Sequence, residues 1–323
     1  MEGVGTRRAA AAVERLIAGY RGGGRAPALR DRDDVAAYAA YRMPATFQAV
    51  RAALSALAEA APGWAPDSHL DVGGGTGAAV WAAAAVWPDG QRPTVVLDQA
   101  EPALALGSEL AAGAAAPAVR AAEWRRRALG TAPAGPGWAP AGLVTVSYVL
   151  GELPEHVRRE VVASAAQAAE GAVVVVEPGT PEGYLRVLAA RQQLVDAGYE
   201  VLAPCPHSAR CPMEGTADWC HFAARVQRSA LHRRVKGGEL GHEDEKFSYV
   251  AAVRVPARAP APARVVRHPQ LRKGLVLLEL CTAGEGLART TVSKRQGPRY
   301  RAARDVRWGD AWPPPGDDGH DGA

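Results

Sequence analysis

Short apolar runs alternate with longer stretches of helical periodicity along the middle of the chain. We expect strands at 69–72, 94–98, 143–148 and 172–177, and helices at 77–87, 103–114, 155–169 and 185–197. The last of these strands is almost continuously apolar, which is typical of a strand buried on both faces of a parallel sheet. Because strands alternate with helices, the pattern predicts an α/β domain with a parallel sheet at residues 63–200.

The alternation stops after Tyr199, and the regions on either side follow other patterns. We expect an N-terminal helical region at 1–62, a cysteine-rich insertion with a basic helix at 201–255, a β-rich basic region at 264–312 and a disordered tail at 313–323. Within them we predict helices at 6–20, about 33–61 and 222–236, and strands at 247–255, 275–281, 288–293 and 300–305.

Positive charge is concentrated late in the chain. Residues 221–307 contain 19 Lys+Arg and 7 Asp+Glu, a net of 19 − 7 = +12, although the whole chain carries only +4. A basic segment on an otherwise acidic protein indicates a polyanionic partner, and an arginine-rich solvated surface is the alternative. The candidate RNA contacts are Arg225, Arg228, Arg233, Arg234, Lys236, Lys294 and Arg295.

The apolar runs also bear on location. None approaches the roughly 20 residues that a membrane span needs, so no membrane partner is expected. Glu14 and Arg15 interrupt the apolar stretch near the N-terminus, which favours an amphipathic helix over a signal peptide. We therefore predict a cytoplasmic protein, in a reducing compartment where disulfides are uncommon.

A glycine-rich loop, Asp71-Val72-Gly73-Gly74-Gly75-Thr76-Gly77, follows the first predicted strand. Glycines let the backbone approach a ligand closely, and the next helix directs its N-terminus toward that ligand. Asp98 ends the following strand, where a carboxylate can accept both hydroxyls of a ribose. The glycines also satisfy a loose dinucleotide fingerprint, so NAD is one alternative and a loop without ligand is another.

The Asp-x-Gly-x-Gly-x-Gly pattern resembles the first motif of class I methyltransferases. The resemblance implies a class I methyltransferase-type, Rossmann-like parallel sheet that binds S-adenosylmethionine. The implied cofactor-binding residues are Asp71, Gly73, Gly75, Gly77, Asp98 and Ser147. Ser147 and Tyr148 lie where such enzymes contact cofactor or substrate. The stretch Ser147–Glu152 does not match the Asn/Asp/Ser-Pro-Pro-aromatic motif of amino-group methylases, so no catalytic residue is assigned.

The chain contains four cysteines, spaced C-x5-C-x8-C-x60-C: Cys205, Cys211, Cys220 and Cys281. Structural zinc usually takes cysteine pairs two to four residues apart, and no such pair is present. Four thiolates at irregular spacing suit a [4Fe–4S] cluster, which takes one thiolate per iron. Zinc and unligated buried cysteines are the alternatives. His207 and His221 are substitute ligands, hydrogen-bond donors near the sulfurs or loop residues, and Trp219 and Phe222 are expected to shield the site.

The motifs around the cysteines resemble the mitochondrial small-ribosomal-subunit methyltransferase-like protein family and its bacterial relatives. They include Pro204-Cys205-Pro206-His207, Cys211-Pro212, Asp218-Trp219-Cys220-His221-Phe222 and Leu280-Cys281-Thr282. The resemblance, over about residues 38–310, implies a small-subunit assembly factor that binds rRNA, holds a [4Fe–4S] cluster through the four cysteines and is monomeric off the ribosome.

Three other functions remain open at this point. One is an active rRNA methyltransferase with the cluster as scaffold or redox sensor. Another is a zinc-bound RNA-binding protein with a vestigial methyltransferase fold. The third, radical chemistry, lacks the usual C-x3-C-x2-C triad.

Overall fold

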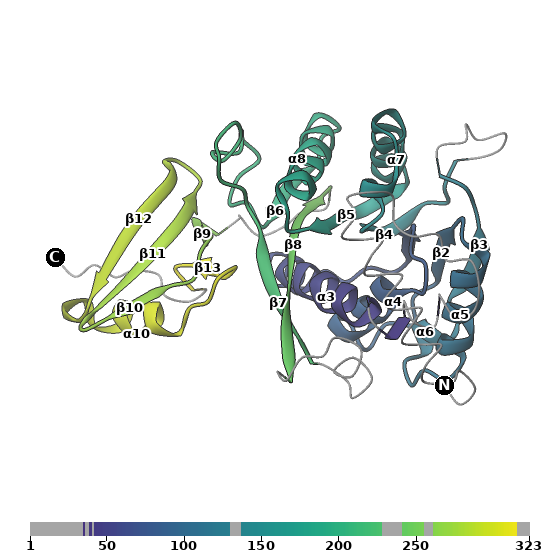
Figure 1. Ribbon diagram of the computed structural model, residues 1–323, viewed down its shortest axis with the longest axis horizontal. Helices are drawn as coiled ribbons and strands as arrows, with labels where there is room; N and C mark the ends of the chain where they lie inside the picture. The colour runs from purple at the N-terminus through teal and green to yellow at the C-terminus, as the bar shows by residue number, and fades with distance from the viewer. Residues whose placement is uncertain are drawn as a thin grey trace.

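A computed structural model of the protein describes residues 42–129, 137–227, 241–254 and 261–314, together with Val35, Ala39 and Ala40. Figure 1 shows a larger lobe of helices and strands beside a smaller, mainly β lobe near the C-terminus. The predicted helix at 6–20 lies outside the described residues, as does the predicted tail beyond residue 314. No helix in the described ranges is long and apolar enough to span a membrane.

The larger lobe is built on one sheet. Its strands are β1 (His69–Val72), β2 (Thr94–Asp98), β3 (Glu123–Arg126), β4 (Ala141–Ser147), β5 (Ala169–Pro178), β6 (Glu200–Ala203), β7 (Phe222–Gln227) and β8 (His242–Val253). Their order is β3-β2-β1-β4-β5-β8-β6, with β7 paired to β8. The strands β1 to β5 are parallel, and β8 is antiparallel to its three neighbours. The strand order reverses between β1 and β4, which is where open α/β sheets bind ligands.

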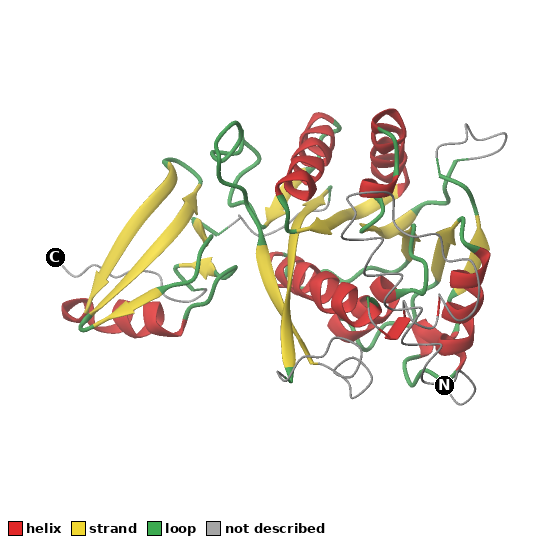
Figure 2. Cartoon of the chain, viewed as in Figure 1, coloured by secondary structure: helices red, strands yellow, loops and turns green. Residues whose placement is uncertain are grey.

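Helices cover both faces of this sheet (Figures 1 and 2). They are α3 (Met43–Ala60), α4 (Ala78–Val86), α5 (Glu101–Ala112), α6 (Pro117–Arg120), α7 (Glu155–Ala168) and α8 (Pro181–Asp196), with a 3₁₀ turn η1 at Leu150–Glu152. Along β5, Val173 and Val175 pack with α7 and α8, whereas Val174 and Val176 pack with α3 and α4. Burial on both faces explains why this strand is continuously apolar.

The sheet continues past the boundary predicted at residue 200. β8 inserts between β5 and β6, so β6, β7 and β8 complete the larger lobe and make its sheet mixed where a parallel sheet was predicted. The strands β3 and β6 were not predicted, because each has only four residues and lacks a long apolar run. Pairing with neighbouring strands determines their conformation.

Residues 222–227 form strand β7, so the prediction of a basic helix there is wrong. Phe222 and Val226 are buried on one face, while Arg225 is exposed and pairs across the ladder with Asp244 at 3.3 Å. Alternation with period two is the strand pattern, and the spacing of basic residues had obscured it. Residues 228–236 of the predicted helix lie outside the described part of the chain.

The smaller lobe is an antiparallel sheet with one helix. Its elements are β9 (Ala263–Val265), β10 (Gln270–Arg272), β11 (Leu275–Thr282), β12 (Gly286–Ser293), a 3₁₀ turn η2 (Lys294–Gln296), α10 (Gly297–Asp305) and β13 (Ala311–Trp312). Its core includes Val276, Leu278, Val292 and Trp312. Residues 300–305, predicted as a strand, belong to α10. Pro298 occupies the first turn of this helix, and Ala303 packs against the sheet.

Candidate cofactor loop and four-cysteine site

The glycine loop joins β1 to α4 at the carboxyl edge of the sheet. Gly73, Gly75 and Gly77 all have positive φ, at 68°, 54° and 82°. A Cβ on Gly73 would lie 2.5 Å from Val149, and one on Gly77 would lie 2.5 Å from Trp124, so packing requires glycine at both positions. A Cβ on Gly75 would have only one neighbour within 4 Å, a carboxylate oxygen of Asp98 at 3.8 Å. Gly75 is therefore the position of the loop that is open to a ligand.

Asp98 lies at the end of β2 and also holds the loop. Its Oδ2 accepts the Gly75 N–H at 2.9 Å, and its Oδ1 accepts the Ala100 N–H at 2.8 Å. Burial raises the pKa of Asp98, and these backbone hydrogen bonds oppose that rise. Each carboxylate oxygen has a further lone pair, so the group retains acceptor capacity for a hydroxyl pair.

Asp71 lies beneath the loop and is fully buried. Its Oδ1 accepts the Thr145 hydroxyl at 2.8 Å, and that hydroxyl oxygen lies 2.8 Å from His69 Nε2. Burial lowers the pKa of His69 to about 3, so Nε2–H of the neutral ring donates to Thr145. Burial raises the pKa of Asp71 to about 7, helped by the charge of Asp98. Asp71 thus supports the loop from below through Oδ1, while its Oδ2 is buried without a hydrogen-bond partner, and its cofactor contact stays a prediction.

The end of β4 carries a polar cluster beside the loop. Ser147 Oγ is buried without a hydrogen-bond partner. Tyr148 has φ of 59°, an uncommon value for a residue with a side chain. Its hydroxyl donates to Glu245 Oε1 at 3.0 Å, and Arg42 holds the same carboxylate at 3.1 and 3.2 Å. Arg42 immediately precedes α3 and Glu245 lies on β8, so nothing in the local sequence indicated their meeting with Tyr148.

The four cysteines converge on one small cavity of about 20 Å³ between the lobes. Cys205, Cys211 and Cys220 lie on the loop between β6 and β7, and Cys281 lies on β11. Pro204, Pro212, Met213, Arg264 and Val266 complete the lining. Burial raises the pKa of Cys205, Cys220 and Cys281, and the other cysteines raise each of these values further. Sixty residues separate Cys220 from Cys281 in the sequence, and the fold brings these thiols close enough for their charges to interact.

Polar groups surround these sulfurs. The Tyr184 hydroxyl lies 3.4 Å from Cys211 Sγ. His207 Nε2 lies 3.7 Å from Cys281 Sγ, and His207 Nδ1 lies 3.2 Å from the Ala209 carbonyl. A carbonyl only accepts, so Nδ1 carries the ring proton and Nε2 accepts from the Cys281 thiol. His207 thus lies beside a sulfur as a hydrogen-bond acceptor, whereas a donor was one of its predicted roles.

The predicted shielding residues have different roles. Trp219 packs against the buried cluster of Tyr184, Met213, Val266 and Cys281. His221 stacks on Trp219 with ring centroids 5.2 Å apart and does not line the cavity. Phe222 belongs mainly to the aromatic core with Phe247 and Tyr249. In the part of the chain that the structure describes, no group of three or more His, Cys, Asp or Glu side chains is placed to hold a metal ion.

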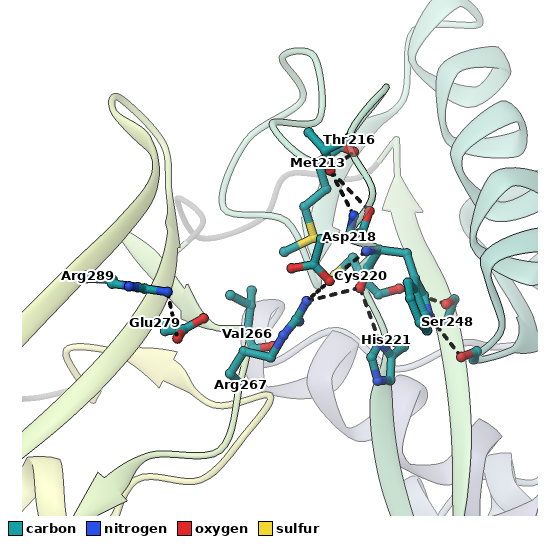
Figure 3. A network of polar contacts seen from close by, with 12 residues as sticks. Met213, Thr216, Asp218, Cys220, His221, Ser248, Val266, Arg267, Glu279 and Arg289 are labelled. Carbon is teal, nitrogen blue, oxygen red and sulfur yellow. Dashed lines mark hydrogen bonds and ion pairs between the residues drawn. The ribbon is translucent and has the colours of Figure 1, made fainter.

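The smaller lobe reaches this site through two arginines. Arg264 donates to the Pro204 carbonyl at 2.8 Å and to the Gly309 carbonyl at 3.0 Å. Arg267 forms an ion pair with Asp218, and Figure 3 shows it extending from the smaller lobe toward the cysteine loop. Neither arginine stands out in the sequence, because arginines are common throughout residues 221–307.

The predicted RNA contacts are only partly described. Arg225 is engaged with Asp244 on the surface of the β7–β8 ladder. Lys294 and Arg295 lie exposed on η2, at the edge of the smaller lobe. Arg228, Arg233, Arg234 and Lys236 lie outside the described residues.

The architecture of the larger lobe defines a methyltransferase-like α/β protein with a mixed sheet and a glycine loop at its switch point. The chain belongs to the Rsm22 family, described as mitochondrial small ribosomal subunit Rsm22, whose model matches residues 32–313. This match confirms the family predicted from the sequence.

Individual relatives agree with this assignment, and the chain also resembles solved structures in outline. The chain is 29% identical over 293 residues to the human mitochondrial ribosome assembly protein METTL17, covering 85% of this chain and 62% of that protein. It is 27% identical over 184 residues to the mitochondrial Rsm22-cox11 tandem protein 2 of Schizosaccharomyces pombe, covering 44% of this chain and 24% of that protein. A magnesium protoporphyrin IX methyltransferase from Synechocystis PCC 6803, solved with bound SAM, superposes with a TM-score of 0.41 at 12% identity, covering 79% and 100% of the two chains. This chain thus spans less than two thirds of the length of these human and yeast relatives.

The predicted cytoplasmic location is wrong by these comparisons. The family and the human and yeast relatives are all mitochondrial by name, which points to mitochondria rather than to the cytoplasm. The prediction rested on the lack of a membrane span and of a signal peptide. Neither feature distinguishes a protein of the cytoplasm from a protein of the mitochondrial interior.

Proposed function

We propose that this protein is an assembly factor of the small ribosomal subunit that binds rRNA, carries S-adenosylmethionine on the glycine loop and holds a structural [4Fe–4S] cluster in the four-cysteine cavity. Family membership over residues 32–313 supports the ribosomal role. The single observation that carries the combined proposal is the convergence of all four cysteines between the two lobes. A group bound there would fix the basic smaller lobe relative to the methyltransferase-like lobe.

The donor set fits a four-iron cluster better than a single ion. Thiolates on one tetrahedral zinc, each about 2.3 Å from the metal, must crowd within about 4 Å of one another. In a four-iron cluster each thiolate binds a different iron, so the sulfurs stand farther apart around a larger core. Four cysteine thiols line the cavity, one for each iron of such a cluster. Bound there, the cluster would supply a rigid, redox-active link.

The open face at Gly75, the carboxylate of Asp98 and the unpartnered Ser147 hydroxyl support a cofactor with a ribose and polar substituents. S-adenosylmethionine fits the methyltransferase-like architecture. Whether a methyl group is then transferred depends on the acceptor side, where Tyr148, Glu245 and Arg42 are bonded to one another. This closed polar cluster favours binding without transfer, and an active rRNA methyltransferase is the second candidate. Methylation of purified small subunits by the wild-type protein would establish the second candidate.

We expect S-adenosylmethionine to raise the melting temperature of the protein. At a concentration of one hundred times its Kd, it should raise the free energy of unfolding by about 2.7 kcal/mol. Asp98→Asn should weaken this binding by about 1.5–3 kcal/mol, because one charged acceptor for the ribose hydroxyls is lost while an oxygen remains for the loop. Differential scanning calorimetry measures the stabilisation, and isothermal titration calorimetry measures the change in affinity. Asp89→Asn, on an exposed carboxylate before β2, is the control and should leave affinity unchanged. Stabilisation by NADH and not by S-adenosylmethionine would reject the cofactor assignment.

The ribosomal half of the proposal is tested on the exposed basic residues of η2. The double variant Lys294→Glu/Arg295→Glu should reduce co-sedimentation with small-subunit precursors and lower the slope of log affinity against log salt by about 1.4, because two phosphate contacts are lost. The double variant Arg125→Glu/Arg126→Glu reverses two exposed arginines on β3 of the larger lobe and should retain binding. Equal binding of both double variants across a salt series would show that the η2 pair makes no RNA contact.

A further inference from the structure

Two arginines beside the cysteine cavity are buried without an opposite charge. Arg191, on α8, is 3% exposed, and Arg264, on β9, is 4% exposed. Within the described residues neither forms an ion pair with a carboxylate: both donate to backbone carbonyls, and Arg191 also acts on the Cys205 thiol and lowers its pKa. Arg191 donates to the carbonyls of His207 and Ala209, at 2.8 and 2.6 Å. Arg264 donates to those of Pro204 and Gly309.

Such an arrangement is costly unless a counter-charge is present. A buried guanidinium is always protonated, and carbonyl dipoles satisfy its hydrogen bonds without cancelling its charge. Arg191 also keeps one buried donor, Nε, with no acceptor. Arg267 provides the contrast, because it lies nearby, is more exposed and is neutralised by Asp218. No carboxylate of the described residues neutralises the two buried arginines. They therefore require an anionic partner of another kind.

The cysteine cavity is where that partner belongs. Arg264 lines the cavity together with all four cysteines. The charges of both arginines act on Cys205 and Cys281, which come from different lobes. A group held by four thiolates is anionic, whether its core is zinc or an oxidised four-iron cluster, with a net charge of about −2 in either case. Two guanidinium groups match this charge.

We propose that Arg191 and Arg264 are positioning residues that supply the counter-charge for an anionic four-thiolate group bound in this cavity. The inference rests on the proposed four-cysteine site and adds the electrostatic condition for its burial. Each lobe contributes one of the two charges, so the site becomes neutral only when the lobes are joined. Arg191 Nε–H is the free donor available to a sulfur of the bound group.

Reduction of a bound cluster gives the sharpest prediction. One electron from dithionite enters the cluster core, no bond forms or breaks, and the net charge becomes more negative by one. Nearby positive charge favours the reduced form, so its removal should make reduction harder. We expect Arg191→Gln and Arg264→Gln each to shift the one-electron reduction equilibrium at least tenfold, which is 59 mV toward more negative potential. Dye-mediated redox titration followed by electron paramagnetic resonance measures this shift.

Three further variants separate charge from hydrogen bonding. Arg191→Lys and Arg264→Lys keep the charge but lose the forked donors, and their potentials should stay within threefold of the wild-type equilibrium. Arg254→Gln is the matched control, because Arg254 also donates to a carbonyl, that of Ala197 at 2.9 Å, but is exposed and does not act on the cysteines. It should change nothing. Equal shifts in the Gln and Lys variants, or none in the Gln variants, would overturn the proposal.

A zinc measurement keeps this inference distinct from the identity of the metal. Zn²⁺ affinity of the metal-free protein, measured by competition with a chromophoric chelator, should fall at least tenfold in both Gln variants and less than threefold in the Lys variants. If the wild-type protein takes up zinc but no iron, the cluster is rejected while this pattern would still support the counter-charge role. Metal-free Gln variants should melt no lower than wild type, because an uncompensated charge has been removed. A wild-type protein that binds neither metal would overturn both proposals.

Discussion

Replacement of Cys281 by serine is expected to abolish the bound cluster and to loosen the smaller lobe. Anaerobically purified wild-type protein should contain about four irons per chain and absorb broadly at roughly 400 nm. Cys281 is the one proposed ligand from the smaller lobe, whereas the other three lie on a single loop of the larger lobe. Without it the proposed cluster would lose its only covalent link to β11, so iron content and the 400 nm band should both collapse.

The loosening should appear in hydrogen exchange. The lobes also meet through Arg264, Arg267 and the ring of Trp308 against His221, so partial contact remains after cluster loss. Amides of β9 and β11 should exchange faster in Cys281→Ser, while those of β1 and β4 stay protected. Cys211→Ser should lose iron to the same extent, and Thr291→Ser, on an exposed position of β12, should retain all of it. Retention of four irons by Cys281→Ser would exclude it as a ligand.

Glu177→Ala should destabilise the larger lobe by about 3–5 kcal/mol, as expected for breaking a buried ion pair. Glu177 ends β5 and is completely buried. Its Oε2 lies 2.6 Å from Arg186 Nε, and its Oε1 accepts the Leu150 N–H at 3.0 Å. The substitution leaves a half-buried guanidinium without its anion and a buried N–H without its acceptor. Urea denaturation monitored by tryptophan fluorescence measures the loss.

An exposed ion pair provides the comparison for this measurement. Glu123 pairs with Arg125 on β3, and both side chains are more than half exposed. Water and salt screen such pairs, so Glu123→Ala should cost about 0.5 kcal/mol or less. If Glu177→Ala costs no more than Glu123→Ala, the buried carboxylate does not organise the end of β5 beside the cofactor loop.

The local sequence was enough to predict β1, β2, β4 and β5 of the larger lobe, although not β3. Burial of β5 on both faces requires a continuous apolar run, and the helix–strand alternation requires crossovers, so both are visible without coordinates. The glycine loop could also be predicted from the sequence, because its local geometry requires glycine. Gly73 and Gly77 adopt positive φ and face side chains that leave no space for a Cβ. The four cysteines, with their neighbours, were also sufficient to indicate the family, which residues 32–313 match.

Only the tertiary structure decided which distant residues meet. β8 inserts between β5 and β6 because backbone pairing and burial on both faces favour it there, and short-range periodicity carries no information on strand order. The same limit applies to Asp71, whose burial beneath the loop depends on Thr145 of another strand. It applies most strongly to Arg191 and Arg264, which have no distinguishing motif. Their proposed role depends on the fold, which places one buried arginine from each lobe beside four thiols. An uncompensated positive charge at that position requires an anion.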